Sequence, residues 1–303
     1  MGNQIYTTVP ATTANLGPGY DVLGLALSLY LSAVAEPAQE WSVISRGEGA
    51  DLLDTCGENL IIRAYRQICA ARGWPDRPMR VIADNSIPIA RGLGSSAAAI
   101  ITGMALAQLQ NQGCIDREAL FQEAAILEGH PDNIAAAVFG GLQEVRPSNN
   151  KYCASNRSFH DSIRVLLVIP GSMKSTAELR TVVPVTLAPE EQAENDLALK
   201  NLLDGLARAD STLLRFSESD KRHQPYRLAV QPESQAIFRL LQGINDIAGV
   251  FLSGAGTSVG GWVLGKRDPT PDVGRALMDL SIPAEVRLIG PERHGVKGAI
   301  REH

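Results

Sequence analysis

The sequence predicts an α+β fold of two domains, the first over residues 1–155 and the second over residues 156–303. A chain of 303 residues is long for a single hydrophobic core. Residues 149–161 are polar and rich in serine and asparagine, as expected where one domain ends and another begins. After this segment, the expected order of strand, helices, two strands, helix and strand indicates a ferredoxin-like second domain.

The composition excludes several classes of protein. A net charge of −5 and the lack of a basic run argue against a nucleic-acid partner. The four cysteines have no C-x-x-C spacing, so they indicate reduced thiols and not disulfides or a zinc site. No apolar run approaches membrane-spanning length and no cleavable signal is recognisable, so we expect a cytoplasmic protein without a membrane partner. The oligomeric state is open, and a homodimer is compatible with the sequence.

The first half of the chain alternates strands and helices. Strands are expected at residues 5–9, 25–35, 41–45 and 79–83, with the second and third paired around a turn. A polar loop is expected over residues 11–21, where a Gly-Pro-Gly segment enforces a turn. Residues 59–73 are expected to form an amphipathic helix with its isoleucines on one side.

A glycine-rich loop leads into the next helix. The stretch Pro88-Ile-Ala-Arg-Gly-Leu-Gly-Ser-Ser-Ala-Ala98 places two glycines directly before two serines and an alanine-rich run. The helix is expected from Ala97 to Leu109, with Gly113 ending it. Glycines let backbone N–H groups turn inward, and the first helical turn adds unpaired N–H donors and the positive end of the helix dipole. This pattern favours a phosphate site.

Two known phosphate motifs fit this loop poorly. A P-loop requires a lysine after its last glycine, where Ser95 stands here. A dinucleotide fingerprint is formally present over residues 92–97, but Pro88 interrupts the central strand that should precede it. From the loop alone, a helix entry with glycines for close packing is as good an interpretation as a phosphate site.

A second group of polar residues lies at the end of the helix that Asp116 is expected to cap. In Glu128-Gly-His-Pro-Asp-Asn133, two carboxylates, an imidazole and an amide fall beside an apolar helix, which indicates a site. Pro131 suits the first turn of a short helix that ends at Gly140. We expect Asp132 to be structural, because a carboxylate in a first turn interacts favourably with the helix dipole by about 0.3–1 kcal/mol.

The second half is expected to begin with a buried strand at residues 163–169. Ser175-Thr-Ala-Glu178 has the form of a capping box and starts a helix that carries Arg180. A buried strand later ends in the glycine loop of residues 249–258. The other helices and strands of this half are expected at residues 189–208, 259–264, 271–280 and 286–289.

Three of these stretches resemble motifs of the GHMP small-molecule kinases, in the order of that family. They are Pro-x-x-x-Gly-Leu-Gly-Ser-Ser-Ala from Pro88, the segment of residues 128–133 and the glycine loop of residues 249–258. The resemblance implies a two-domain GHMP-kinase-like fold with an N-terminal nucleotide-binding domain, and ATP as a substrate. It implies that Ser96 and Glu128 bind Mg²⁺, a hard ion that prefers oxygen ligands. ATP would lie on Pro88, Ile89, Ala90, Arg91, Gly92, Leu93, Gly94, Ser95, Ser96, Ala97 and Ala98.

Two further segments resemble the homoserine kinases of that family: the loop of residues 11–21 and His-x-Pro-Tyr-Arg at residues 223–227. The resemblance implies that ATP phosphorylates the side-chain hydroxyl of L-homoserine, in threonine biosynthesis. A carboxylate would bind the ammonium group and guanidinium groups the carboxylate. The implied substrate residues are Asn15, Asp21, His130, Arg180 and Arg227. The implied catalytic residues, which orient the reacting groups, are Asn133, His130 and Arg180.

Two other functions remain open. Another GHMP kinase would act on a sugar or on mevalonate, whose charges do not call for Asp21 together with paired arginines. A nucleotide or metabolite sensor would keep the fold without catalysis, and the presence of Ser96 and Glu128 disfavours it. A serine hydrolase using Ser95 is disfavoured because Ser95 does not lie in a Gly-x-Ser-x-Gly segment.

Overall fold

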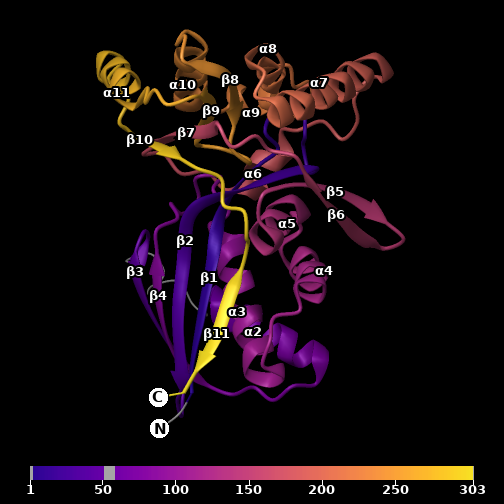
Figure 1. The fold of residues 1–303 in the computed structure, drawn as a ribbon, viewed down its shortest axis with the longest axis vertical. Helices are drawn as coiled ribbons and strands as arrows, with labels where there is room; N and C mark the ends of the chain where they lie inside the picture. Colours follow the sequence, from indigo (N-terminus) through magenta and orange to yellow (C-terminus); the bar gives the residue numbers. More distant parts are fainter. Residues whose placement is uncertain (1–2, 51–58, 303) are drawn as a thin grey trace.

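The structure, a computed structural model, describes residues 3–50 and 59–302. It has two layered parts, which Figure 1 shows one above the other. In the lower part helices pack against a long, curved sheet, and in the upper part helices cover a second, smaller sheet. The two ends of the chain lie side by side at the bottom. The predicted α+β class is confirmed.

The first sheet has seven strands among the described residues. Its main path runs β11-β1-β2-β4-β3, and a hairpin of β5 and β6 pairs with the start of β2. Only the β3–β4 pairing is parallel among the described strands of this sheet. The strands are β1 (Gln4–Ala14), β2 (Leu23–Pro37), β3 (Ser42–Gly47), β4 (Met79–Asn85), β5 (Leu142–Ser148), β6 (Lys151–Arg157) and β11 (Lys297–Arg301).

The prediction that the second and third strands pair with each other is wrong. β4 lies between β2 and β3, so that Ala83 is opposite Ala33 on one side and Ser45 on the other. The chain passes from β3 to β4 through helix α2 (Leu60–Arg72). A crossover through a helix makes the two strands parallel, whereas a tight turn joins antiparallel neighbours.

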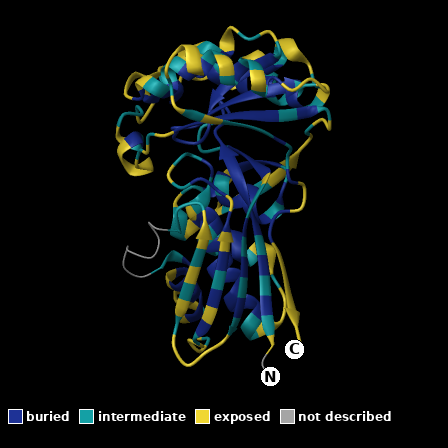
Figure 2. Ribbon diagram, turned by 90° about the vertical axis from the view of Figure 1, so that its left-hand side faces the viewer, coloured by how far each residue is buried: buried dark blue, intermediate teal, exposed yellow. Residues whose placement is uncertain are grey.

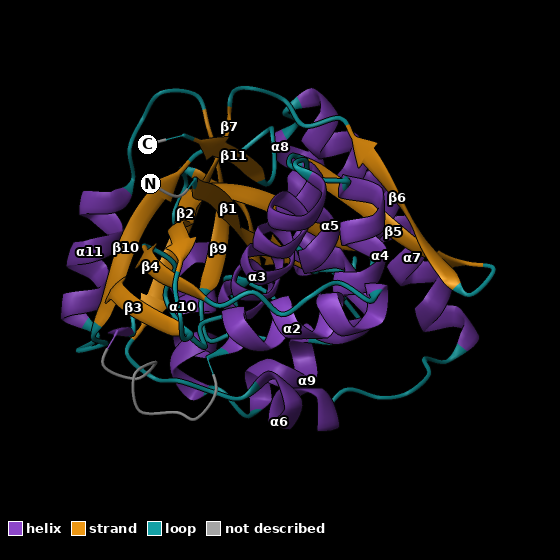
Figure 3. Ribbon diagram, turned by 90° about the horizontal axis from the view of Figure 1, so that it is seen from below, coloured by secondary structure: helices purple, strands orange, loops and turns teal. Residues whose placement is uncertain are grey.

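In the described part of the chain, helices lie on one side of this sheet, as Figure 3 shows from below. They are α2, α3 (Ser95–Gln112), α4 (Arg117–Glu128) and α5 (Pro131–Phe139). Each was predicted, and their ends follow local signals. The side chains of Asn59 and Asp116 cap α2 and α4, while Gly73 and Gly113 end α2 and α3 in the left-handed conformation.

Two segments expected to be irregular are strands. Residues 149–161 were expected to be an irregular linker, but β5 and β6 form a hairpin that turns at Asn149 and Asn150. The polar residues of β6 are mostly exposed, which a strand at a sheet edge permits. β1 continues into the expected loop as far as Ala14, because residues 11–14 pair with residues 24–27 of β2.

The second sheet has the order β10-β7-β9-β8 with antiparallel neighbours, which is the ferredoxin-like arrangement that was predicted. Its strands are β7 (Ile163–Pro170), β8 (Ile247–Leu252), β9 (Val259–Leu264) and β10 (Ala284–Ile289). Figure 2 shows these buried strands beneath helices whose outer faces are exposed. The helices are α6 (Thr176–Thr181), α7 (Pro189–Arg208), α8 (Ser211–Leu214), η1 (Arg215–Glu218), α9 (Gln224–Ala229), α10 (Pro232–Gln242) and α11 (Thr270–Asp279). Ser175 precedes α6 as predicted, but its side chain makes no capping hydrogen bond.

Loops from both parts meet where the two sheets approach each other. The hydroxyl of Ser253, after β8, donates to the carbonyl of Gly92 at 2.8 Å and pairs with the hydroxyl of Thr13 at 2.8 Å. β6 spans the boundary expected at residue 155, and β11 belongs to the first sheet although it follows the second in the chain. We propose a domain boundary after β6, with β11 returning to the first domain. Among the described residues, no helix is long and apolar enough to cross a membrane.

Candidate active site

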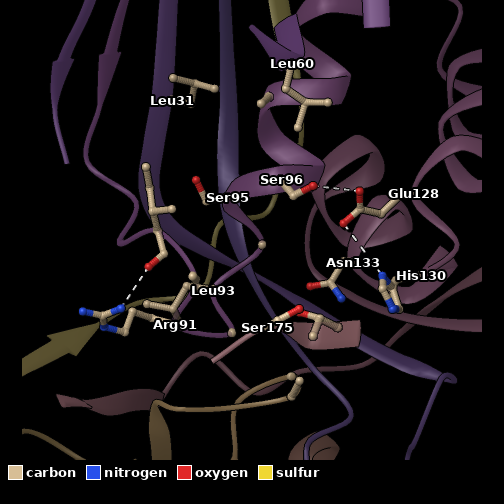
Figure 4. Close-up of a pocket in the computed structure, with 18 of the residues that line it drawn as sticks. Leu31, Leu60, Arg91, Leu93, Ser95, Ser96, Glu128, His130, Asn133 and Ser175 are labelled. Carbon is tan, nitrogen blue, oxygen red and sulfur yellow. Dashed lines mark hydrogen bonds and ion pairs between the residues drawn. The ribbon is translucent and has the colours of Figure 1, made fainter. Parts of the chain in front are cut away.

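A cavity of about 350 Å³ lies at this junction. Residues 89–96 form its middle, between an apolar end and a polar end. In Figure 4, Leu31 and Leu60 lie at the apolar end, while Asn133, His130 and Ser175 lie at the polar end. The polar end is also lined by Asn15, Asp21, Glu128, Asp132, Lys174, Thr176, Arg227 and Gly254.

The middle of the cavity is the start of helix α3. Its N-cap residue, Gly94, is left-handed at φ 72°, and no side chain caps the helix. Because no side chain satisfies them, the N–H groups of the first turn are available to an anion, which the helix dipole also favours. A Cβ added at Gly92 would lie 2.1 Å from the carbonyl oxygen of Ser253, and one at Gly94 would lie 2.0 Å from the Thr12 hydroxyl. The two glycines therefore allow a close approach that larger residues would prevent.

Not every residue of the expected ATP loop faces the cavity. Pro88, Ala97 and Ala98 do not line it, whereas residues 89–96 do. Arg91 lines the cavity, but each of its three guanidinium nitrogens donates to a backbone carbonyl, of Ile89, Pro170 and Gly171 at 3.2, 2.9 and 2.7 Å. Arg91 thus ties the loop to the end of β7 through three of its five N–H groups.

Ser96 and Glu128, the expected magnesium ligands, are in contact. The Ser96 hydroxyl donates to Oε2 of Glu128 at 2.9 Å, and Oε1 of Glu128 lies 3.8 Å from Nδ1 of His130 (Figure 4). Ser96 lies in the first turn of α3 and Glu128 is the last residue of α4, so the packing of these two helices brings the oxygens together. A hydroxyl and a carboxylate beside a phosphate loop are ligands of the type Mg²⁺ prefers.

Asp132 and Asn133 lie in the first turn of α5. Asp132 is 2% exposed, and its Oδ1 accepts from the backbone N–H of Asn133 at 2.8 Å. Burial, followed by the nearby negative charge of Asp21, raises the pKa of Asp132 to about 6. The Asn133 amide oxygen accepts from the Thr12 hydroxyl at 2.7 Å. The sequence did not single out Thr12, although it lies in the segment that resembles homoserine kinases.

Asp21 and Arg180 are brought together as an ion pair. One guanidinium nitrogen of Arg180 lies 2.5 Å from each carboxylate oxygen of Asp21, and Nε donates to the Tyr20 hydroxyl at 3.2 Å. Asp21 lines the cavity and Arg180 lies directly behind it. The pKa of Arg180 is raised, because its hydrogen bond to Tyr20 and the charge of Asp21 outweigh its burial. Tyr20 was not singled out from the sequence.

Arg227 is the second expected carboxylate ligand, and it is 2% exposed. It donates to the carbonyls of Leu179 and Gly254 at 3.1 and 3.2 Å and contacts the His223 ring at 3.2 Å. Burial lowers the pKa of its guanidinium. Among the described residues no carboxylate contacts Arg227 directly, and it lines the cavity. A buried cation without an anionic partner is suited to an anionic ligand.

Asn15 supports the loop that carries Asp21. Its amide nitrogen donates to the carbonyl of Gly254 at 2.7 Å, and its amide oxygen accepts from the backbone N–H of Asp21 at 3.0 Å. Asn15 lines the cavity but uses both ends of its amide in these contacts. It therefore fixes the position of Asp21 relative to the second domain.

Comparisons with known proteins identify the family of this chain. Residues 59–141 match the family described as GHMP kinases N terminal domain. The homoserine kinase of Moorella thermoacetica is 34% identical over 288 residues, which cover 95% of this chain and 97% of that protein. The homoserine kinase of Cutibacterium acnes is 39% identical over 276 residues, 88% of this chain and 91% of that protein.

A solved structure shares the whole fold. The crystal structure of homoserine kinase from Cytophaga hutchinsonii superposes with a TM-score of 0.83 at 21% identity and covers 97% of both chains. At this identity the superposition speaks for the fold, while the sequence relatives carry the family. The chain therefore belongs to the GHMP kinases and, within them, to the homoserine kinases.

Proposed function

We propose that this protein transfers the γ-phosphoryl group of ATP to the side-chain hydroxyl of L-homoserine, which forms O-phospho-L-homoserine for threonine biosynthesis. The observation that carries the proposal is a single cavity lined both by the uncapped N-terminus of α3 and by the buried Arg227. Each of these groups is suited to bind an anion. Sequence similarity to homoserine kinases over 95% of the chain supports the choice of substrate.

ATP binds along the loop and the apolar end of the cavity. The phosphates lie on the loop of residues 89–96, where N–H donors of the first turn of α3 are free of side-chain caps. The nucleotide base lies at the apolar end, which strands β2 and β4 and the first turn of α2 line with Leu31, Ala83, Leu60 and Ile61. An aromatic base gains from burial against such apolar groups.

Ser96 and Glu128 hold Mg²⁺, and their donor set fits that ion. Both ligand atoms are oxygens, they lie 2.9 Å apart, and they stand at the edge of the phosphate loop. The chemistry that Mg²⁺ would supply when held by these two residues is neutralisation of charge on the transferring phosphoryl group. His130, next to Glu128, is close enough to orient both the carboxylate and the amino acid.

Homoserine binds at the polar end. Its carboxylate is held by Arg227, with Arg180 as the second guanidinium, and its ammonium group is held by Asp21. Asn15 contributes by holding Asp21 in place. Each contact pairs a charge of the zwitterion with the opposite charge on the protein.

The reaction needs orientation more than proton transfer. The homoserine oxygen attacks the γ-phosphorus and the bond to ADP breaks, through a loose transition state that places little charge on the attacking oxygen. The proton of the homoserine hydroxyl passes to an oxygen of the transferring phosphoryl group late in the reaction. Asn133 and His130 orient the hydroxyl, and Arg180 steadies the substrate. We keep Asp132 as a structural residue, because a loose transition state needs little from a base and its Oδ1 accepts from the backbone N–H of Asn133.

A comparison of substrates tests the proposal. Release of ADP is measured with L-homoserine, mevalonate, galactose and shikimate at equal concentrations, and the phosphorylated product is identified by ³¹P NMR. We expect turnover with L-homoserine and background rates with the other three. Equal or faster turnover of mevalonate or galactose would identify another GHMP kinase. Binding of ATP without turnover of any substrate would identify a sensor.

Two further expectations accompany this function. A biosynthetic kinase meets ATP and homoserine in the cytoplasm, so we place the protein there, and cell fractionation tests the location. A homodimer stays a prediction, which light scattering of the purified protein tests.

A further inference from the structure

His223 is a fully buried histidine between the two parts of the substrate site. Its side chain is 0% exposed. One ring nitrogen, Nε2, lies 3.0 Å from the carbonyl oxygen of Gly17, in the loop that carries Asp21. The other, Nδ1, lies 3.2 Å from a guanidinium nitrogen of Arg227. One imidazole thus connects the loop of residues 15–21 with the cation expected to bind the substrate carboxylate.

The partners of the ring determine its tautomer. A guanidinium nitrogen only donates, so Nδ1 of His223 must accept from Arg227. A carbonyl oxygen only accepts, so Nε2 carries the hydrogen and donates to Gly17. The Asp220 carboxylate, 3.4 Å from Nε2, favours the same placement of that hydrogen. Burial lowers the pKa of His223, and Arg227 lowers it further, which keeps the ring neutral.

Other contacts in this region leave Nδ1 as the side-chain acceptor that orients Arg227. The other hydrogen-bond acceptors of Arg227 among the described residues are the backbone carbonyls of Leu179, in α6, and of Gly254, in the loop after β8. The Tyr20 ring packs on both residues, with its centroid 5.3 Å from the His223 ring and 5.1 Å from the Arg227 guanidinium carbon. Tyr20 precedes Asp21 in the chain, so the packing couples the two halves of the amino-acid site.

We propose that His223 is a positioning residue, whose neutral ring with hydrogen on Nε2 orients Arg227 toward the substrate carboxylate and anchors the loop of residues 15–21. The inference rests on the proposed function, because it names the group that sets the geometry of the carboxylate ligand. His223 touches neither ATP nor homoserine and acts through Arg227 and Gly17. Its loss therefore weakens homoserine binding and leaves ATP binding unchanged.

Two amide variants test the roles of the two ring nitrogens separately. His223→Asn places an amide oxygen where Nδ1 lies and keeps the acceptor for Arg227. His223→Gln places an amide nitrogen where Nε2 lies and keeps the donor to Gly17, but removes the acceptor. A hydrogen bond to a charged group is worth about ten- to a hundredfold in an equilibrium constant. We expect His223→Gln to raise the KM for homoserine by about that factor and His223→Asn by several-fold less.

The controls distinguish positioning from general damage. The KM for ATP is expected to stay within about twofold of wild type in both variants, and the exposed His294→Gln is expected to change neither constant. Equal increases in the homoserine KM for the Asn and Gln variants would overturn the proposal, as would an equal rise in the KM for ATP. If the wild type does not phosphorylate homoserine at all, the proposed function fails, and this result is distinct from equal KM increases in the two variants.

If the variants do not fold, a measurement on the wild type still tests the proposal. In enzyme labelled with ¹⁵N-histidine, five rings are expected to give signals. We expect one ring to stay in the form protonated on Nε2 across the neutral pH range, and its Nδ1 signal to shift on addition of L-homoserine but not of ATP alone. A spectrum without such a ring would overturn the proposal.

Discussion

One guanidinium nitrogen of Arg180 lies 2.5 Å from both carboxylate oxygens of Asp21. These two groups were expected to bind opposite ends of one amino acid, and in the structure they form an ion pair with each other. A zwitterion carries the same two charges, so we propose that homoserine exchanges partners with the pair: its ammonium group would replace the guanidinium at Asp21, and its carboxylate would replace Asp21 at Arg180.

This exchange predicts coupling between the two residues. Asp21→Asn and Arg180→Gln are each expected to raise the KM for homoserine by about ten- to a hundredfold, because each removes a charge-assisted contact. In the double variant the KM for homoserine is expected to rise by less than the product of the two single increases, since either substitution already breaks the ion pair. KM values for homoserine in the four proteins measure this cycle. Strictly multiplicative effects would show that the two residues act independently.

The proposed role of Arg227 predicts that a substrate needs a carboxylate to be phosphorylated efficiently. Arg227→Lys keeps a positive charge but loses the planar fork, so the KM for homoserine is expected to rise more than the KM for ATP. L-Homoserine amide, which lacks the carboxylate, is expected to be a poor substrate of the wild type. Equal rates with the amide and the acid would contradict the role of Arg227.

The contact between Ser96 and Glu128 predicts a metal-dependent defect. Glu128→Gln keeps the size of the side chain and removes its charge, so kcat is expected to fall roughly 100-fold or more. Glu118→Gln, an exposed position on the same helix, is the matched control and is expected to behave as wild type. Rates are measured across a Mg²⁺ titration. Normal turnover of Glu128→Gln at limiting Mg²⁺ would reduce Glu128 to a helix-end residue.

The raised pKa of Asp132 predicts that the stability of the protein depends on pH. Its pKa is raised from 3.8 to about 6, so between these values the folded protein holds a proton that the unfolded chain has released. Wild-type stability therefore falls as pH rises through this window, and the loss is complete above about pH 6. The raised pKa corresponds to about 3 kcal/mol, which exceeds the 0.3–1 kcal/mol of the helix dipole.

Asp132→Asn removes the buried charge and tests this sign. Loss of the interaction with the helix dipole would by itself make the variant less stable. Because the buried Asp132 carboxylate costs more than this interaction gains, we expect the variant to be more stable than wild type by about 2 kcal/mol at neutral pH. The advantage should vanish near pH 4, and denaturant unfolding across pH measures it. The kcat is expected to fall by less than about tenfold. A thousandfold loss of kcat with unchanged stability would instead make Asp132 the general base.

Local signals explain what the sequence determined by itself. Helix α7 begins at Pro189 and ends at Arg208 as predicted, and Gly113 ends α3, because propensity, caps and helix-ending glycines act within a few residues. The glycine-rich loop and its two serines were recognised for the same reason. The ferredoxin-like order of the second sheet followed from the order of its elements along the chain.

Tertiary structure decided which groups face each other. Arg180 pairs with Asp21 across 159 residues, and His223 reaches Gly17 across 206 residues, so no local pattern could announce either contact. The same holds for Arg91, whose motif implied a phosphate contact but whose guanidinium is occupied by carbonyls of β7 and the residue after it. Motifs specify which chemical groups are present, whereas their partners, burial and tautomers depend on how distant segments pack together.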